Sequence, residues 1–224
     1  MKERPILFSG PMVRTILSGQ KTVTRRPTSP KLVSAFDAPR GQGDVEAGYP
    51  FVECRDGYQP AVEFCPYGRV GDRLWVRETH KIATGKAGDS QACVRYEADG
   101  EYQAKVLPMP ESIGPRTFDR TRPSIHMPRW ASRILLEVTD VRVERLRDSD
   151  DIALLDELGD MLEDCDSVAG REFSRIESLQ VAGAPLKMLP EMYGFKAWWD
   201  KTNGGGSFDA NPWVWVVEFK RIEP

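Results

Sequence analysis

The chain has 224 residues, of which 40% are hydrophobic and 29% are charged, and its formal net charge is −3. This length and apolar content allow a sizeable hydrophobic core. The slight excess of acidic groups excludes a basic coat that would hold nucleic acid over the whole surface, so any such contact must come from a local patch.

Cysteine and histidine usage gives little support for a metal site. The four cysteines form no CxxC pair, and the chain has only two histidines. We therefore expect reduced thiols, no metal and no cofactor. The opening residues lack the long apolar segment of a signal peptide, and no apolar run approaches the length of a membrane span. These features predict a cytoplasmic protein without a membrane partner.

The first predicted element is a short helix over residues 11–19. Pro11 suits the first helical position, Ser9 or Gly10 can cap the helix, and Gly19 can end it in a left-handed conformation. The apolar residues at helical spacing are Met12, Val13, Ile16 and Leu17. This pattern predicts an amphipathic helix that leads into a loop or the start of a strand.

The next part of the chain is rich in turn residues. Residues 27–64 predict a long insertion with one hairpin within 49–65, because Pro, Gly and Asp are frequent and periodicity is weak. An alternating strand follows over 73–79. Residues 84–122 predict a second insertion, with a hairpin over 94–106.

A long strand, or a strand with a bend, is predicted over 132–146. An acidic helix then starts at a Ser149 cap, and its apolar residues are Ile152, Leu155 and Leu158. The residues around 160–188 are weakly patterned and predict a third insertion. A further helix begins at Pro190 and stops at a glycine run.

The closing residues alternate large apolar groups with others, which predicts a half-buried strand over 213–221. Strands far apart in sequence, joined by loops and three helices, predict an α+β fold. We expect the strands 73–79, 132–145 and 213–221 to share a small barrel or curled sheet, with the first helix packed beside it. No linker divides the chain, so residues 1–224 are predicted to form one domain with insertions.

The first chemical candidate is the stretch LSGQKTVTRR, which places Lys21, Thr24, Arg25 and Arg26 within six positions. A lysine and a threonine three residues apart can point to one side of a bend. A threonine hydroxyl needs a base before it can attack a carbonyl carbon, and a desolvated lysine can serve as that base. On the residues alone, a solvated turn is the alternative interpretation.

A second candidate is an arginine-rich segment whose members are Arg116, Arg120, Arg122, Arg129 and Arg133, with His126 and Trp130 among them. It could form a positive patch on which Trp130 stacks a base. The alternative is a loop whose arginines pair with carboxylates. Three acidic residues are further candidates: Glu78, which follows Arg77 at the end of a strand, and the adjacent pair Asp156 and Glu157. The competing interpretations are a structural role for Glu78 and a solvated position for the pair.

Four blocks of the sequence together resemble one protein family. They are residues 5–26, 65–80, 123–159 and 191–222. The most specific element is the pattern G-x-K-T-x-T-x-R, formed by Gly19, Lys21, Thr22, Thr24 and Arg26. On these motifs the chain resembles ASCH-domain proteins, especially the larger type encoded by bacteriophages and prophages, which would place it in the host cytoplasm.

The resemblance implies a PUA-like fold, a small mixed β-barrel with flanking helices and a cleft beside the first helix. It also implies a function linked to RNA or nucleosides. Compact bacterial members hydrolyse the acetyl amide of N4-acetylcytidine with a lysine and a threonine of this motif, which match Lys21 and Thr24, and with a glutamate of a later helix. Alignment on Ala153 puts Asp156 at the glutamate position, whereas restoring one missing residue puts Glu157 there.

Two hypotheses follow. In the first, the protein is an amidohydrolase in which Thr24 attacks the acyl carbon, Lys21 accepts its proton, and Asp156 or Glu157 assists. In the second, it only binds a modified nucleoside or single-stranded RNA; RNA cleavage and a virion role are less favoured. The residues proposed for ligand binding are Ser9, Arg25, Arg26, Arg77, Glu78, His126, Arg129 and Trp130.

Overall fold

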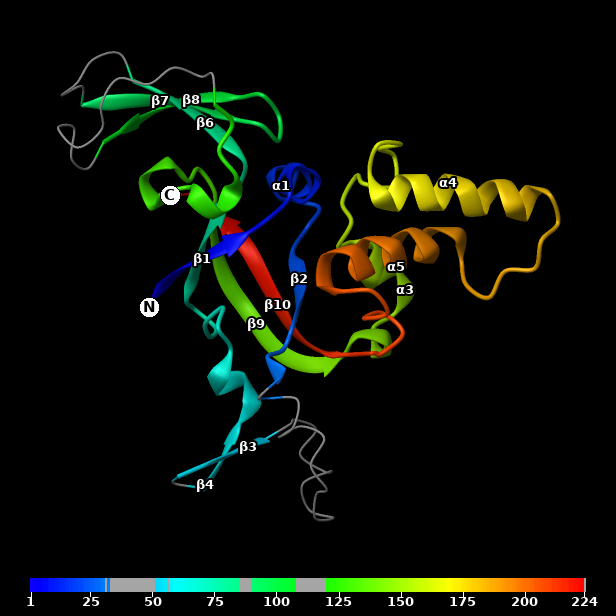
Figure 1. Cartoon of the computed structure of the whole chain (residues 1–224). Helices are drawn as coiled ribbons and strands as arrows, with labels where there is room; N and C mark the ends of the chain where they lie inside the picture. Colours follow the sequence, from blue (N-terminus) through cyan, green and yellow to red (C-terminus); the bar gives the residue numbers. More distant parts are fainter. Residues whose placement is uncertain (31, 33–50, 56, 85–89, 108–119, 224) are drawn as a thin grey trace.

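The computed structural model describes residues 1–30, 32, 51–55, 57–84, 90–107 and 120–223 (Figure 1). Its centre is a five-stranded sheet with the strand order β1-β5-β9-β10-β2. The strands are β1 (Glu3–Leu7), β2 (Val23–Pro27), β5 (Arg73–Arg77), β9 (Leu135–Arg145) and β10 (Trp213–Ile222). β1 and β5 run parallel, and the other neighbouring pairs in this sheet are antiparallel.

The three predicted long strands all belong to this sheet, and the fold is α+β as expected. A closed barrel is not observed, because in the described part of the chain β1 and β2 are the two edges of an open sheet. The chain between these edges forms α1 (Gly10–Leu17). The two edge strands are connected by a side chain rather than by backbone hydrogen bonds: Arg26 in β2 donates a hydrogen bond of 3.0 Å to the carbonyl oxygen of Leu7 in β1.

Two smaller sheets lie at opposite ends of the view in Figure 1. One contains β6 (His80–Ala83), β7 (Gln91–Tyr96) and β8 (Tyr102–Val106), and the other pairs β3 (Phe51–Cys54) with β4 (Gly57–Pro60). Both predicted hairpins are therefore confirmed. Among the described residues, the short 3-10 segments are η1 (Ala61–Phe64), η3 (Ser124–His126), η4 (Arg129–Ala131) and η5 (Leu146–Asp148).

The first and last predicted helices are present. α1 has Pro11 in its first turn and Ser9 at its N-cap, and Gly19 follows it with a φ of 79°, the left-handed conformation that the sequence predicts. α5 (Pro190–Asn203) begins at the expected proline and ends at Gly204. The helix α1 buries its predicted apolar face at Met12, Val13 and Ile16.

Two helical predictions need correction. The acidic helix is only α3 (Asp151–Leu155), and its cap is Asp150, whose side chain accepts a hydrogen bond from the Ala153 amide. Ser149 does not cap it. Within the weakly patterned third insertion, residues Val168–Val181 form the helix α4, which packs on α5 (Figure 1). The sequence did not indicate α4 because few of its side chains are buried.

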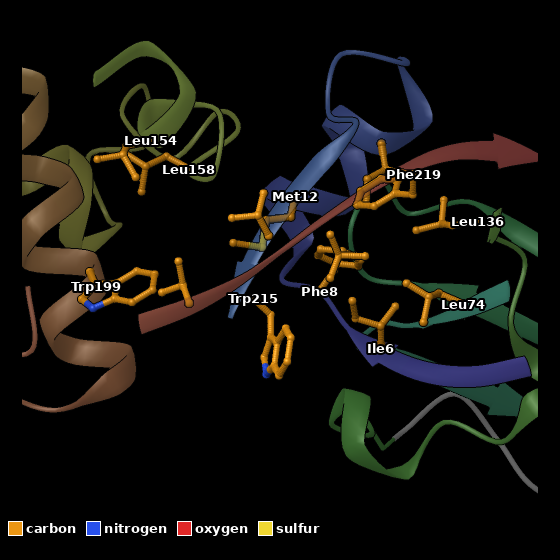
Figure 2. Packing of buried hydrophobic residues seen from close by; sticks show 14 of the residues in the cluster. Ile6, Phe8, Met12, Leu74, Leu136, Leu154, Leu158, Trp199, Trp215 and Phe219 are labelled. Carbon is orange, nitrogen blue, oxygen red and sulfur yellow. The ribbon is translucent and has the colours of Figure 1, made fainter. Parts of the chain in front are cut away.

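β10 is more deeply buried than its alternation suggested. Four consecutive residues of this strand, Val214 to Val217, are buried, so both faces of the strand are covered. Figure 2 shows Trp199 of α5 with Leu154 and Leu158 on one side of β10, and Ile6 with Leu74 on the other. The helices therefore form a second layer over the sheet, and β2 lies at the edge where this layer meets α1.

Candidate functional site

Lys21, Thr24 and Glu157 meet at one carboxylate oxygen. Lys21 Nζ donates a hydrogen bond to Glu157 Oε2 over 3.0 Å, and the Thr24 hydroxyl donates to the same oxygen over 3.2 Å. The left-handed turn at Gly19 directs the chain from α1 into β2, and Glu157 comes from the turns after α3. The fold thus brings Glu157 next to Lys21 and Thr24, which precede it in the sequence by 136 and 133 positions. We refer to these three residues as the Lys21–Thr24–Glu157 cluster.

Arg25 holds the other side of this cluster. Its Nη1 lies 3.6 Å from Glu157 Oε1 and donates a hydrogen bond of 2.8 Å to the carbonyl oxygen of Ala153. Its Nε donates to the Ser149 hydroxyl over 3.0 Å, and that hydroxyl in turn donates to Glu144. These contacts hold the guanidinium against α3 and β9 in the closed arrangement, so Arg25 is a positive neighbour of the Glu157 carboxylate.

The cluster is closed to solvent. The side chains of Lys21 and Glu157 are 0% exposed, and Thr24 is fully buried as well. Burial is the main cause that lowers the pKa of Lys21; Arg26 and Arg25 lower it further, while Glu157 opposes the shift. Glu157 Oε1 is a buried oxygen without a hydrogen-bond partner. A lysine with a lowered pKa beside a hydroxyl and a carboxylate is typical of functional sites.

The structure distinguishes between the two acidic candidates. Glu157 contacts both Lys21 and Thr24, whereas the side chain of Asp156 is exposed. Asp156 takes part only through its backbone carbonyl oxygen, which accepts a hydrogen bond of 3.2 Å from Lys21 Nζ. Glu157 is therefore the acidic group of the cluster, and the side chain of Asp156 is not.

A pocket of about 360 Å³ adjoins the cluster through Arg25. It is formed by Phe8 and Ser9 at the junction of β1 and α1, by Arg26 in β2, and by Trp198 near the end of α5. Its volume lies in the range typical of small-molecule sites, about 300–1,000 Å³. A second pocket, of about 370 Å³, includes Lys21 and Asp156 in its lining.

Among the other predicted residues, Glu78 is not paired with its neighbour Arg77. Both carboxylate oxygens of Glu78 accept hydrogen bonds of 2.9 Å from Arg133, which also pairs with Asp99 at 2.8 Å. Arg77 donates instead to the carbonyl oxygen of Ser124 over 3.1 Å. Glu78 and Arg133 are buried, and this ion pair connects the chain after β5 with the residues just before β9.

In the described part of the chain, two arginines of the predicted patch pair with carboxylates, whereas Arg120 is exposed. Arg133 is buried and paired, and Arg129 forms an ion pair of 2.8 Å with Glu3. His126 is exposed, and Trp130 is half-buried against the small core of the β6–β8 sheet. Arg116 lies outside the described residues. These residues are not gathered around the Lys21–Thr24–Glu157 cluster, so the structure does not unite the two sequence candidates.

Sequence reasoning missed two kinds of site residue. Ser149 and Glu144 fix Arg25, but Ser149 carries a helix-cap signal and Glu144 lies in an ordinary strand pattern. Trp198 lines the 360 Å³ pocket, although its aromatic neighbourhood indicates only core. A long-range contact map is needed to find such residues, because their signals resemble those of structural positions.

Searches against protein-family models, curated proteins and solved structures found no match for this chain. Within the described residues, no group of three or more His, Cys, Asp or Glu side chains could hold a metal ion. The helices in that same part of the chain include none that is both long and apolar enough to cross a membrane.

The two histidines have contrasting environments. His80 is 0% exposed, with Nδ1 3.0 Å from the carbonyl oxygen of Glu78 and Nε2 buried without a partner. Burial lowers the pKa of His80 below the ordinary 6.5; nearby Arg122, Arg77 and His126 lower it further, against the hydrogen bond with Glu78. His126 is exposed.

We therefore expect acid to destabilise the fold through His80. Below pH 6.5 the unfolded state binds this proton more readily than the folded state, so the free energy of unfolding falls as pH decreases from 6.5 toward the folded pKa. The slope is at most about 1.4 kcal/mol per pH unit. Urea unfolding between neutral and acidic pH should show a flatter profile for His80→Gln than for wild type or His126→Gln. Equal profiles for all three proteins would refute this assignment.

Proposed function

We propose that this chain is a PUA-like, ASCH-type amidohydrolase that removes an acyl group from N4-acetylcytidine or a related modified nucleoside. The observation that supports the proposal most is the convergence of Lys21 and Thr24 on Glu157 Oε2, at 3.0 and 3.2 Å. A hydroxyl, an amine with a lowered pKa and a carboxylate can supply the nucleophile and the proton acceptors of a metal-independent acyl transfer. The sequence motif and its family resemblance supply the substrate class.

The contacts suggest how the reaction proceeds. Thr24 Oγ1 forms a bond to the acyl carbon while its proton passes to Glu157 Oε2, the atom to which it already donates. The bond between the acyl carbon and N4 breaks, and the released amine takes a proton from the cluster. Water then attacks the Thr24 ester, which frees the carboxylic acid and restores the hydroxyl. Atoms and protons balance without an added cofactor.

This scheme revises the role that the sequence suggested for Lys21. No described contact joins Lys21 Nζ to Thr24 Oγ1, and both groups instead reach Glu157 Oε2. Lys21 therefore exchanges protons with Thr24 through the carboxylate. Since burial and neighbouring arginines lower its pKa, the neutral amine needed to receive a proton is more accessible than for an exposed lysine.

Substrate access requires a local movement. Thr24 is 0% exposed, and Arg25 belongs both to the contacts of Glu157 and to the lining of the 360 Å³ pocket. We propose that displacement of the Arg25 side chain connects this pocket with Thr24. The burial of Thr24 favours a second candidate function, recognition of a modified nucleoside without turnover. In that case the cluster would only stabilise the wall of the pocket.

A measurement of turnover distinguishes hydrolysis of the nucleoside from recognition without turnover. Purified protein should release acetate and cytidine from N4-acetylcytidine, measured by chromatography against a no-enzyme control. Binding of the intact nucleoside without any product from it or from other N4-acylated cytidines would reject the hydrolase and leave the recognition module.

The paired acidic residues provide a matched test of the cluster. Glu157→Gln should lower kcat by at least about 10²-fold, because it removes the oxygen that accepts the Thr24 proton. Asp156→Asn should leave kcat within about twofold of wild type, since its side chain is exposed and its backbone carbonyl is retained. Steady-state kinetics on folded variants gives both values. A larger loss in Asp156→Asn than in Glu157→Gln would contradict the assignment.

A further inference from the structure

The charged side chains that line the 360 Å³ pocket are all positive. Arg25 and Arg26 contribute guanidinium groups, and none of the described residues that line the pocket is Asp or Glu. Arg25 is compensated by Glu157 and Glu144, at 3.6 Å from each. Any charge that the pocket offers to a ligand therefore comes from Arg26.

Arg26 is held in place without being neutralised. Its guanidinium donates hydrogen bonds of 3.0 Å to the carbonyl oxygens of Arg25 and Leu7, and it lies 5.2 Å from the centre of the Phe8 ring. A guanidinium has five N–H donors, so these two bonds leave three available. No carboxylate pairs with Arg26 in the described part of the chain, in contrast to Arg129, which pairs with Glu3.

Two further groups complete the pocket. Ser9, at the N-cap of α1, makes no side-chain capping bond, so its hydroxyl is free to contact a ligand. Trp198 is half-buried, and its ring is held by Phe195 and Trp199, with ring centres 5.6 and 6.1 Å away. A fixed indole at a pocket wall can stack on the face of a base. The pocket thus combines an aromatic surface with an unpaired guanidinium.

We infer that this pocket binds a phosphorylated nucleoside, with the phosphate monoester on Arg26 and the base against Trp198. Guanidinium groups bind phosphate through paired, charge-assisted hydrogen bonds, and a site without carboxylates imposes no repulsion on the anion. The inference builds on the proposed function and narrows its substrate from a free nucleoside to a nucleoside monophosphate. A nucleotide seated there would lie beside Arg25, the residue that separates the pocket from Thr24.

Binding of ligands without an acyl group tests this inference separately from turnover. Calorimetric titration would compare cytidine, cytidine 5′-monophosphate and a short single-stranded cytidine oligonucleotide without a terminal phosphate. We expect the monophosphate to bind at least about tenfold more tightly than cytidine, as for a hydrogen bond to a charged group. Equal affinities for these two ligands would overturn the inference, and tighter binding of the oligonucleotide would show that the site reads a strand.

Substitutions in the pocket test whether the phosphate group of the ligand binds at Arg26. Arg26→Gln should abolish the preference for the monophosphate, whereas Arg26→Lys should retain part of it. Arg221→Gln is the matched control, since Arg221 also donates to a backbone carbonyl, that of Leu17, but does not line the pocket. Trp198→Leu should weaken cytidine and its monophosphate alike, by at least about fivefold. A preference that survives in Arg26→Gln would overturn the assignment. If the monophosphate binds as expected but no acylated form is hydrolysed, only the proposed function fails.

Discussion

Replacement of Thr24 with alanine should reduce hydrolysis of N4-acetylcytidine by about 10³-fold or more, because it removes the attacking oxygen. The folded state should lose about 2 kcal/mol, since the change removes one hydrogen bond, to Glu157 Oε2, and one buried methyl group, but no charge. Ligand binding should be nearly unchanged. Single-turnover kinetics, denaturant unfolding and calorimetry on the same preparation would measure these three quantities.

Two controls make this prediction specific. Thr24→Ser keeps the hydroxyl and should retain measurable turnover. Thr22→Ala removes an exposed hydroxyl two residues away and should behave as wild type. If Thr24→Ala hydrolyses the substrate as fast as Thr22→Ala does, Thr24 is not the nucleophile.

Replacement of Lys21 with methionine should abolish turnover and also destabilise the fold by about 3–5 kcal/mol, because it leaves Glu157 as an uncompensated buried charge. Arg25, at 3.6 Å from the other carboxylate oxygen, offsets part of this loss. The double variant with Glu157→Gln should recover much of the stability, since it removes the stranded charge, yet it should remain inactive.

A double-mutant cycle measured by urea unfolding would determine this coupling between Lys21 and Glu157. A coupling energy near zero would mean that the two groups do not form a buried pair. Recovery of activity in the double variant would contradict their catalytic roles. The single variant Lys21→Arg should be as inactive as Lys21→Met, because a guanidinium does not act as a base near neutral pH.

The sheet was predictable from the sequence because its strands carry strong local patterns. Alternating or continuously apolar residues over 73–79, 132–145 and 213–221 correspond to β5, β9 and β10. The alternation in β10 suggested one solvated face, yet α5 covers it. α4 was not predicted, because it is stabilised by packing on α5 rather than by a strong apolar stripe of its own.

The candidate site was predictable only in part. Lys21 and Thr24 stand three residues apart in a recognisable motif, so the sequence identified them together. The choice between Asp156 and Glu157 could not be made from spacing, because it depends on how the turns after α3 orient two adjacent side chains. The pairing of Arg133 with Glu78 and Asp99 joins distant segments, and for this reason Arg133 resembled a member of a surface patch.

The central claim, that Thr24 is the nucleophile of an amidohydrolase, can be tested most directly by trapping its acyl intermediate. Wild-type protein mixed with N4-acetylcytidine and quenched in acid within the first turnover would be measured by intact mass spectrometry and peptide mapping. We predict a mass increase of one acetyl group on the peptide that carries Thr24, and no increase in Thr24→Ala. Acetylation at another residue, or hydrolysis that persists in Thr24→Ala without any acylated protein, would contradict the account.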